Sequence, residues 1–108
     1  MVKPMTPEPI LRMLNGLWIT QTLAVAVDLD VFTLVSNDAN TLEKIADSLH
    51  TSARPIEMLL NALVSLDLLE KQGSNYHNTQ LSETFLVKGK SNYYGDFVLM
   101  ETVDLLTI

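Results

Sequence analysis

Few residues of this 108-residue sequence have the type and spacing that catalytic or metal chemistry requires. Asp28 and Asp30 form a carboxylate pair that suggests metal binding or acid–base work, but no histidine or further carboxylate lies close in sequence to complete a ligand set. His50 ends an expected helix and His77 lies in an expected strand, each without a Ser, Asp or second His at a useful spacing. We therefore predict no catalytic residue, no cofactor site and no metal site in this chain, and we expect Asp28 and Asp30 to be solvated capping residues.

The recognition of nucleic-acid bases is a second chemistry to consider. The segment SARPIEMLLNALVSLD predicts a helix whose polar stripe consists of Arg54, Glu57, Asn61 and Ser65. Asn61 has the amide that adenine recognition uses, but a reading helix also needs cations around it for phosphates. The formal net charge is -6. We therefore predict that nucleic acid is not a partner.

Composition restricts the remaining classes of protein. The chain has no cysteine, which excludes disulfides and thiolate chemistry and fits a cytoplasmic location. The N-terminus lacks the charged, apolar and small-residue order of a secretion signal. The apolar run from Leu17 to Val27 is interrupted by polar residues and is shorter than the roughly 20 residues that span a bilayer. We expect one cytoplasmic domain of residues 1–108 and no membrane contact.

The first expected helix is the strongest indication of a partner. Thr6 is its expected N-cap, and the helix should continue to about Val27. Its apolar residues occupy nearly the whole circumference, so it must be covered on more than one side. Either this small domain wraps the helix completely, or a second chain covers one side. We predict a homodimer, with an interface formed by Ile10, Met13, Leu14, Leu17, Trp18, Gln21 and Val25.

The rest of the chain predicts short elements around that helix. DLDVFTLV indicates a short helical turn, and TLEKIADSLH indicates an amphipathic helix with Thr41 as N-cap. After the helix in SARPIEMLLNALVSLD, the segment LLEKQGSNYHNT indicates a β-hairpin with Gly73 and Asn75 at its tip. Two further helices are expected, around 81–86 and in NYYGDFVLMETVDLLTI. The fold class is therefore mainly α, a winged helix-turn-helix with a long N-terminal dimerisation helix, a small β-hairpin wing and C-terminal helices.

A family resemblance follows from the order and spacing of these segments. GLWITQTLAVAVDLDVFTL, TLEKIA, RPIEMLLNAL, LLEK and YHNTQLSETFL together resemble the N-terminal dimerisation domain of the class I, S-adenosylmethionine-dependent O-methyltransferases. The resemblance covers nearly the whole chain, from about Ile10 to Leu106. The family often has glycine where this chain has Asp30 and Asp67. Both positions suit a left-handed or helix-ending backbone, and Asp tolerates that conformation better than most residues, though less well than Gly.

The resemblance implies an intertwined homodimer and a parent enzyme that methylates a small molecule. S-adenosylmethionine would bind in a following Rossmann-like domain that this chain does not contain. The chain stops at Ile108 inside an apolar helix, which suggests the first domain of a longer protein. Trp18 and Met100 are candidates to line the parent enzyme's substrate pocket, although packing in a core or interface is the simpler role. A stand-alone acidic winged-helix transcription regulator, or a dimerising partner protein without catalysis, remains an alternative.

Overall fold

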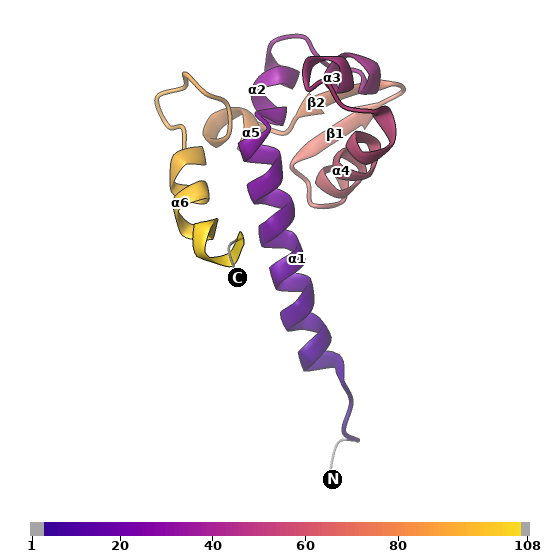
Figure 1. Ribbon diagram of the computed structural model, residues 1–108, viewed down its shortest axis with the longest axis vertical. Coiled ribbons are helices and arrows are strands. Elements are labelled where there is room, and N and C mark those ends of the chain that lie inside the picture. The colour runs from indigo at the N-terminus through magenta and orange to yellow at the C-terminus, as the bar shows by residue number, and fades with distance from the viewer. Residues whose placement is uncertain (1–3, 107–108) are drawn as a thin grey trace.

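The computed structural model describes residues 4–106, which are mainly helical with one small antiparallel sheet. Figure 1 shows the arrangement of the elements along the chain. The helices and strands are, in order, α1 (Glu8–Asp28), α2 (Val31–Ser36), α3 (Leu42–Ser48), α4 (Ala53–Ser65), β1 (Leu69–Gln72), β2 (Asn75–Asn78), α5 (Gln80–Phe85) and α6 (Gly95–Leu106). The predicted order of helices and hairpin is confirmed, and Ile108 lies outside the described residues.

Helix α1 runs from the compact part of the molecule far out to one side (Figure 1). Its C-terminal half packs against α2, α4 and α6, and α6 runs back beside it in the opposite direction. The N-terminal half extends beyond these neighbours, which gives the molecule principal extents of 55 × 31 × 27 Å. A long helix with only one end packed in its own chain therefore dominates the shape.

The core lies where α1 enters the group formed by α2, α3, α4 and the hairpin. Small residues of α1, Ala24 and Ala26, are fully buried and allow the neighbouring elements to approach closely. Phe32 of α2 is also fully buried. The other core side chains come from α1 through β2 and from the segment after α5: Val27, Val31, Val35, Ile45, Ala46, Ile56, Leu60, Leu63, Leu69, Tyr76, Leu86 and Val87.

The hairpin has a tighter turn than the sequence analysis placed there. Gln72 pairs with Asn75, so Gly73 and Ser74 form a two-residue turn and Asn75 is the first residue of β2. The prediction that Asn75 lies at the tip is therefore wrong by one residue. Gly73 has φ of 62°, the left-handed backbone that such turns require and that glycine adopts without steric cost.

The two predicted N-caps of the first and third helices have different outcomes. Thr41 precedes α3, and its side-chain oxygen accepts a hydrogen bond of 3.2 Å from the amide of Lys44, as predicted. Thr6 does not cap α1, because Pro7 occupies the N-cap position and makes no side-chain cap bond. The prolines near this end lack amide hydrogens that the first turn of a helix leaves unpaired in any case.

Both aspartates at the expected glycine positions have left-handed backbone. Asp30 has φ of 59° at the junction between α1 and α2, and Asp67 has φ of 59° between α4 and β1. These angles are uncommon for residues with a side chain, and Asp is among those that tolerate them best. At both positions this chain therefore has a backbone geometry that glycine would adopt without steric cost.

Candidate functional site

The residues predicted for the dimer interface form one exposed apolar stripe on α1. We call Ile10, Met13, Leu14, Leu17, Trp18, Gln21 and Val25 the α1 stripe. Its apolar members are between 41% and 74% exposed, and Gln21 is exposed as well. At 3.6 residues per turn these seven positions fall within an arc of about 140° of the helix circumference. The chain therefore presents a continuous apolar helix face that its own fold leaves uncovered.

The opposite side of the same helix differs in its two halves. In the N-terminal half it carries Glu8 and Arg12, whose side chains form an exposed ion pair with a contact of 2.6 Å. In the C-terminal half Ala26 and Val27 are buried against the core. The fold of the single chain thus covers the C-terminal half of α1 and leaves the stripe exposed along the whole helix.

The size of the exposed surface is consistent with an uncovered face. A compact protein of 12.1 kDa exposes about 6,000 Å². This chain exposes 7500 Å². The radius of gyration is 15.9 Å. A compact domain of this length would have about 13 Å. The chain therefore has an excess of roughly 1,500 Å² over a compact monomer.

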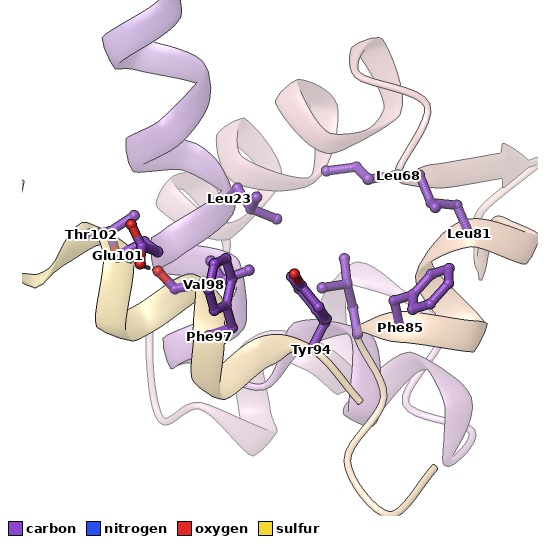
Figure 2. Close-up of a pocket in the computed structure, with 10 residues that line it drawn as sticks. Leu23, Leu68, Leu81, Phe85, Tyr94, Phe97, Val98, Glu101 and Thr102 are labelled. Atoms are coloured by element: carbon purple, nitrogen blue, oxygen red, sulfur yellow. Dashed lines mark hydrogen bonds between the residues drawn. The ribbon is translucent and has the colours of Figure 1, made fainter. Parts of the chain in front are cut away.

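A second apolar surface is a cleft between α5 and α6, which the sequence analysis did not identify. Its volume is about 540 Å³. Figure 2 shows its walls, with Leu23 from α1 on one side and α5 and α6 on the others. We call it the α5–α6 cleft, and it is lined by Leu23, Leu68, Leu81, Phe85, Leu86, Tyr94, Phe97, Val98, Glu101 and Thr102.

The cleft has a fixed shape at its aromatic end. The amide of Tyr94 donates a hydrogen bond of 2.7 Å to the carbonyl oxygen of Phe85, which ties the start of α6 to the end of α5. The rings of Tyr94 and Phe97 lie 4.8 Å apart, centroid to centroid, at an interplanar angle of 52°. This tilted arrangement is a favourable geometry for an aromatic pair.

The chemistry of the cleft walls is that of an apolar binding surface. The hydroxyl of Thr102 donates a hydrogen bond of 2.8 Å to the carbonyl oxygen of Val98, so it is occupied within α6. Among the described residues that line the cleft, Glu101 alone carries a charge, and its side chain is exposed. Among the cleft-lining residues that the structure describes, no nucleophile is paired with a base.

A smaller polar pocket of about 280 Å³ brings several titratable side chains together beside β2. It is lined by Val35, Ser36, Asp38, Asn40, His77, Asn78 and Glu83. The hydroxyl of Ser36 donates a hydrogen bond of 3.0 Å to Glu83 Oε1, so this serine is paired with a carboxylate and not with His77. Although Ser36, Asp38 and His77 share the pocket, the hydrogen bonds of the described residues do not connect them as a catalytic triad requires.

The carboxylate pair of the sequence analysis separates in the structure. Asp28 is exposed, whereas Asp30 accepts an ion pair from Lys88, with Nζ lying 2.9 Å from Oδ1. The hydrogen bond from Lys88 to this carboxylate raises the pKa of the lysine above its ordinary value. Across residues 4–106 there is no group of three or more His, Cys, Asp or Glu side chains that could hold a metal ion.

The two residues considered for a substrate pocket lie on separate exposed surfaces. Trp18 is 49% exposed in the α1 stripe and Met100 is 63% exposed on α6. Neither contributes to the α5–α6 cleft. The cleft escaped the sequence analysis because its walls come from α1, the start of the hairpin, α5 and α6. The aromatic residues of α5 and α6 were the available signal, but helical periodicity alone does not reveal which of them converge.

The fold and its exposed apolar surfaces define a class: a small helical module with a long, partly unpacked helix. The family model of the O-methyltransferase dimerisation domain matches residues 11–88. The chain belongs to this family of dimerisation domains. Among curated proteins, it is 40% identical over 95 residues to the 3-hydroxy-5-methyl-1-naphthoate 3-O-methyltransferase of Streptomyces sahachiroi, a match that covers 87% of this chain and 27% of that protein.

Solved structures agree with this assignment. A structure of an O-methyltransferase family protein from Burkholderia thailandensis superposes with a TM-score of 0.83 at 24% identity, covering 95% of this chain and 31% of that one. A structure of human N-acetylserotonin methyltransferase in complex with SAM superposes with a TM-score of 0.75 at 28% identity, covering 92% of this chain and 31% of that one. The chain therefore spans about a quarter to a third of the length of these relatives.

Helix α1 also meets a weak criterion for a membrane span. By length and composition alone it is apolar enough to cross a bilayer, although 17% of its most apolar window is buried in the fold. The sequence analysis judged only the run from Leu17 to Val27, which is too short to cross a bilayer. The helix itself begins nine residues earlier, at Glu8, and is therefore long enough. An exposed dimerisation helix and a membrane helix share this composition, so an experiment has to distinguish them.

Proposed function

We propose that this chain is the homodimerisation domain of a SAM-dependent O-methyltransferase that acts on a small molecule. The α1 stripe is the observation that carries the proposal, because an apolar helix face this long is unfavourable in water without a partner. The relatives supply the enzymatic class, because they include O-methyltransferases of 3-hydroxy-5-methyl-1-naphthoate and of acetylserotonin, which are small molecules. The excess exposed area of roughly 1,500 Å² is larger than the roughly 800 Å² that each partner contributes to a standard interface.

We also propose that α3, α4 and the hairpin form a winged helix that serves as a scaffold and does not read DNA. Arg54 at the start of α4 and Lys71 on the hairpin are its exposed cations near the reading face. The ammonium of Lys71 lies 5.5 Å from the centroid of the Tyr76 ring, so it is engaged within the hairpin. Glu57 and Glu70 are exposed on the same elements and would repel phosphates.

The residues described here do not fit the methyl donor. In open α/β folds, nucleotide cofactors bind beside a glycine-rich turn that follows a parallel strand. The strands within residues 4–106 form only an antiparallel hairpin, and its turn contains the single glycine Gly73. We propose that S-adenosylmethionine and the methyl acceptor are bound chiefly by a Rossmann-like domain outside these residues. Trp18 and Met100 remain candidates to contribute to the wall of the acceptor site.

The location proposed for the protein is the cytoplasm, with α1 covered by a second copy and not by lipid. Arg12 and Glu8 form an ion pair on the exposed side of the N-terminal half of α1. Placing both charged side chains in hydrocarbon would be costly. A flotation assay with neutral phosphatidylcholine vesicles separates these environments: the dimer should stay with the aqueous fraction, and co-flotation would contradict the proposal.

Light scattering coupled to size-exclusion chromatography tests the dimer directly. The wild-type chain should have twice its mass of 12.1 kDa. Leu17→Glu places a charge at the centre of the α1 stripe and should give a monomer. Ile19→Glu is the matched control, because Ile19 is 42% exposed, as Leu17 is 41% exposed, yet residues two positions apart point to nearly opposite sides of a helix.

The control variant should remain dimeric. Circular dichroism should show the same helix content for both variants, because neither side chain belongs to the core. A monomeric wild-type chain would contradict the proposed function. Equal dissociation of the Leu17→Glu and Ile19→Glu variants would also contradict it, because the α1 stripe would then contribute no more to the dimer than the opposite side of the helix.

A further inference from the structure

The polar pocket beside β2 contains hydrogen-bonding groups that neither the dimer nor methyl transfer uses. It lies where α2, β2 and α5 pack against one another (Figure 1). Two of its side-chain oxygens, Asn78 Oδ1 and Glu83 Oε2, are buried from solvent and have no hydrogen-bond partner among the described residues. We propose that this pocket binds a small primary ammonium ion, whose N–H groups donate to these two oxygens. The site shares no residue with the α5–α6 cleft.

The hydrogen-bond donors next to these oxygens are already occupied within the fold. The hydroxyl of Ser36 donates to Glu83 Oε1 at 3.0 Å. The side-chain amide of Asn78 donates to the carbonyl oxygen of Phe32 at 2.9 Å, and because a carbonyl only accepts, this bond also fixes which end of the amide is the unpaired oxygen. A buried acceptor without a donor is unfavourable. The pocket therefore favours a ligand that donates hydrogen bonds over one that only accepts them.

The charge of the pocket selects a cation among such donors. Asp38 and Glu83 are its two carboxylates, and the described residues that line it include no Lys or Arg. Asp38 and His77 are exposed and form the outer part of the pocket, whereas the unpaired oxygens are buried. A hydrogen bond from a cationic N–H to a carboxylate is roughly twice as strong as a bond between neutral groups. An ammonium ion is therefore preferred over a neutral alcohol.

The size of the pocket suits a short alkyl chain on that ammonium. Its volume is about 280 Å³. A water molecule occupies about 30 Å³ in the liquid, so one ordered water does not fill the pocket. Residues 4–106 contain no group of three or more His, Cys, Asp or Glu side chains that could hold a metal ion. The remaining class of ligand is a short alkylammonium, whose carbon chain can lie against Val35.

A nuclear magnetic resonance titration of the nitrogen-labelled chain tests the site with three probes of similar size. n-Propylammonium has both charge and N–H donors, tetramethylammonium has charge without donors, and 1-propanol has a donor without charge. At constant ionic strength, n-propylammonium should shift the side-chain amide signals of Asn78 and the backbone amide signals of Ser36 and Glu83. Its dissociation constant should be in the millimolar range that so small a ligand allows. The other two probes should bind at least about tenfold more weakly.

Glu83→Gln is the decisive variant. Glutamine keeps the oxygen that accepts from Ser36 and replaces the unpaired oxygen by an amide nitrogen that donates, so n-propylammonium should bind about tenfold or more weakly. Glu57→Gln is the matched control, because it removes the same charge from an exposed position on α4 outside the pocket. It should change the affinity by less than about twofold, since solvent and salt screen a distant exposed charge.

A second variant keeps the test valid if circular dichroism shows that Glu83→Gln does not fold. Asp38 has φ of 72°, a backbone that asparagine also tolerates, so Asp38→Asn removes a charge at the outer part of the pocket without straining the chain. It should weaken the binding of n-propylammonium by about two- to fivefold, as expected for an exposed charge.

Three results would overturn the proposal. Equal shifts with n-propylammonium and tetramethylammonium would show only a general attraction of cations to a chain with a net charge of -6. Pocket signals that move with none of the probes would leave water as the partner of the two oxygens. A folded Glu83→Gln protein that binds n-propylammonium as tightly as the wild type would exclude Glu83 as a ligand-binding residue. The homodimer is tested separately by light scattering and stands or falls on its own.

Discussion

The side-chain amide of Asn78 on β2 donates a hydrogen bond of 2.9 Å to the backbone carbonyl oxygen of Phe32 on α2, 46 residues earlier in the chain. Phe32 is fully buried, so this bond joins the hairpin to the centre of the core. A buried polar group that loses its hydrogen bond costs more free energy than the bond contributes on average. This amide is therefore one of the contacts that hold the hairpin on the helices, together with the hydrogen bond of 2.7 Å from the amide of Tyr76 to the carbonyl oxygen of Asn40.

Replacing Asn78 by aspartate should lower the free energy of unfolding by about 1–3 kcal/mol, because a carboxylate cannot donate to the Phe32 carbonyl. Urea denaturation followed by circular dichroism measures the change. Asn75→Asp at the exposed start of the same strand should cost less than about 0.5 kcal/mol. Equal losses in the two variants would show that the hydrogen bond has no special weight.

The two N-caps Thr41 and Ser52 allow a test of capping energetics. Thr41 accepts a hydrogen bond from the amide of Lys44, whereas Ser52 makes no side-chain cap bond at the start of α4. Thr41→Ala should therefore destabilise the protein by about 0.5–2 kcal/mol, and Ser52→Ala should have a clearly smaller effect. Thermal unfolding of both variants decides the matter, and a larger loss for Ser52→Ala would contradict the structure.

The left-handed backbone at Asp67 predicts which substitutions at this position the protein tolerates without losing stability. Glycine at this position should be neutral or stabilising, because it adopts a positive φ without steric cost. Valine should destabilise the protein by about 1–2 kcal/mol or more, since a β-branched side chain is a genuine outlier there. At Asp30 the change to glycine should be less favourable than at Asp67, because it also removes the ion pair with Lys88. Parallel urea titrations of the three variants would reveal any other order.

Two groups near the start of α6 predict a loss of stability in alkaline solution. The hydrogen bond to Asp30 raises the pKa of Lys88 above 10.5, and partial burial raises the pKa of Tyr93 above 10.0. In both cases the folded state holds its proton more tightly than the unfolded chain. This contribution to stability is therefore complete below the unfolded-state pKa values and is lost as pH rises through the raised ones.

Melting temperatures measured from about pH 9 to pH 12, the range around these pKa values, should fall less steeply for the double variant Lys88→Met, Tyr93→Phe than for the wild type. The slope difference matters here, since both substitutions also change the melting temperature at neutral pH. Identical slopes would show that other groups control the alkaline transition. Lys71→Met is the control, because Lys71 is also an exposed lysine but makes no ion pair among the described residues.

Much of the fold could be predicted because local patterns determine local structure. The apolar spacing around Ile45 indicated α3, and Thr41 was correctly assigned as its cap. The expected glycine positions Asp30 and Asp67 were predicted to have a left-handed or helix-ending backbone, and both are left-handed. The errors were also local: the hairpin turn was displaced by one residue, and α1 begins after Pro7 and not after Thr6. End residues depend on a few hydrogen bonds, so pattern alone locates them poorly.

The sequence by itself determined the helical class, the family and the apolar character of α1, because these depend on residue types and their spacing along the chain. Only the tertiary structure decided which side of α1 remains exposed, since α6 and the core cover some of its apolar residues and leave the α1 stripe uncovered. It alone also formed the α5–α6 cleft from Leu23, Phe85 and Phe97, residues of three different helices. A concave surface requires elements that are distant in sequence to meet in space, and periodicity within one element carries no information about that meeting.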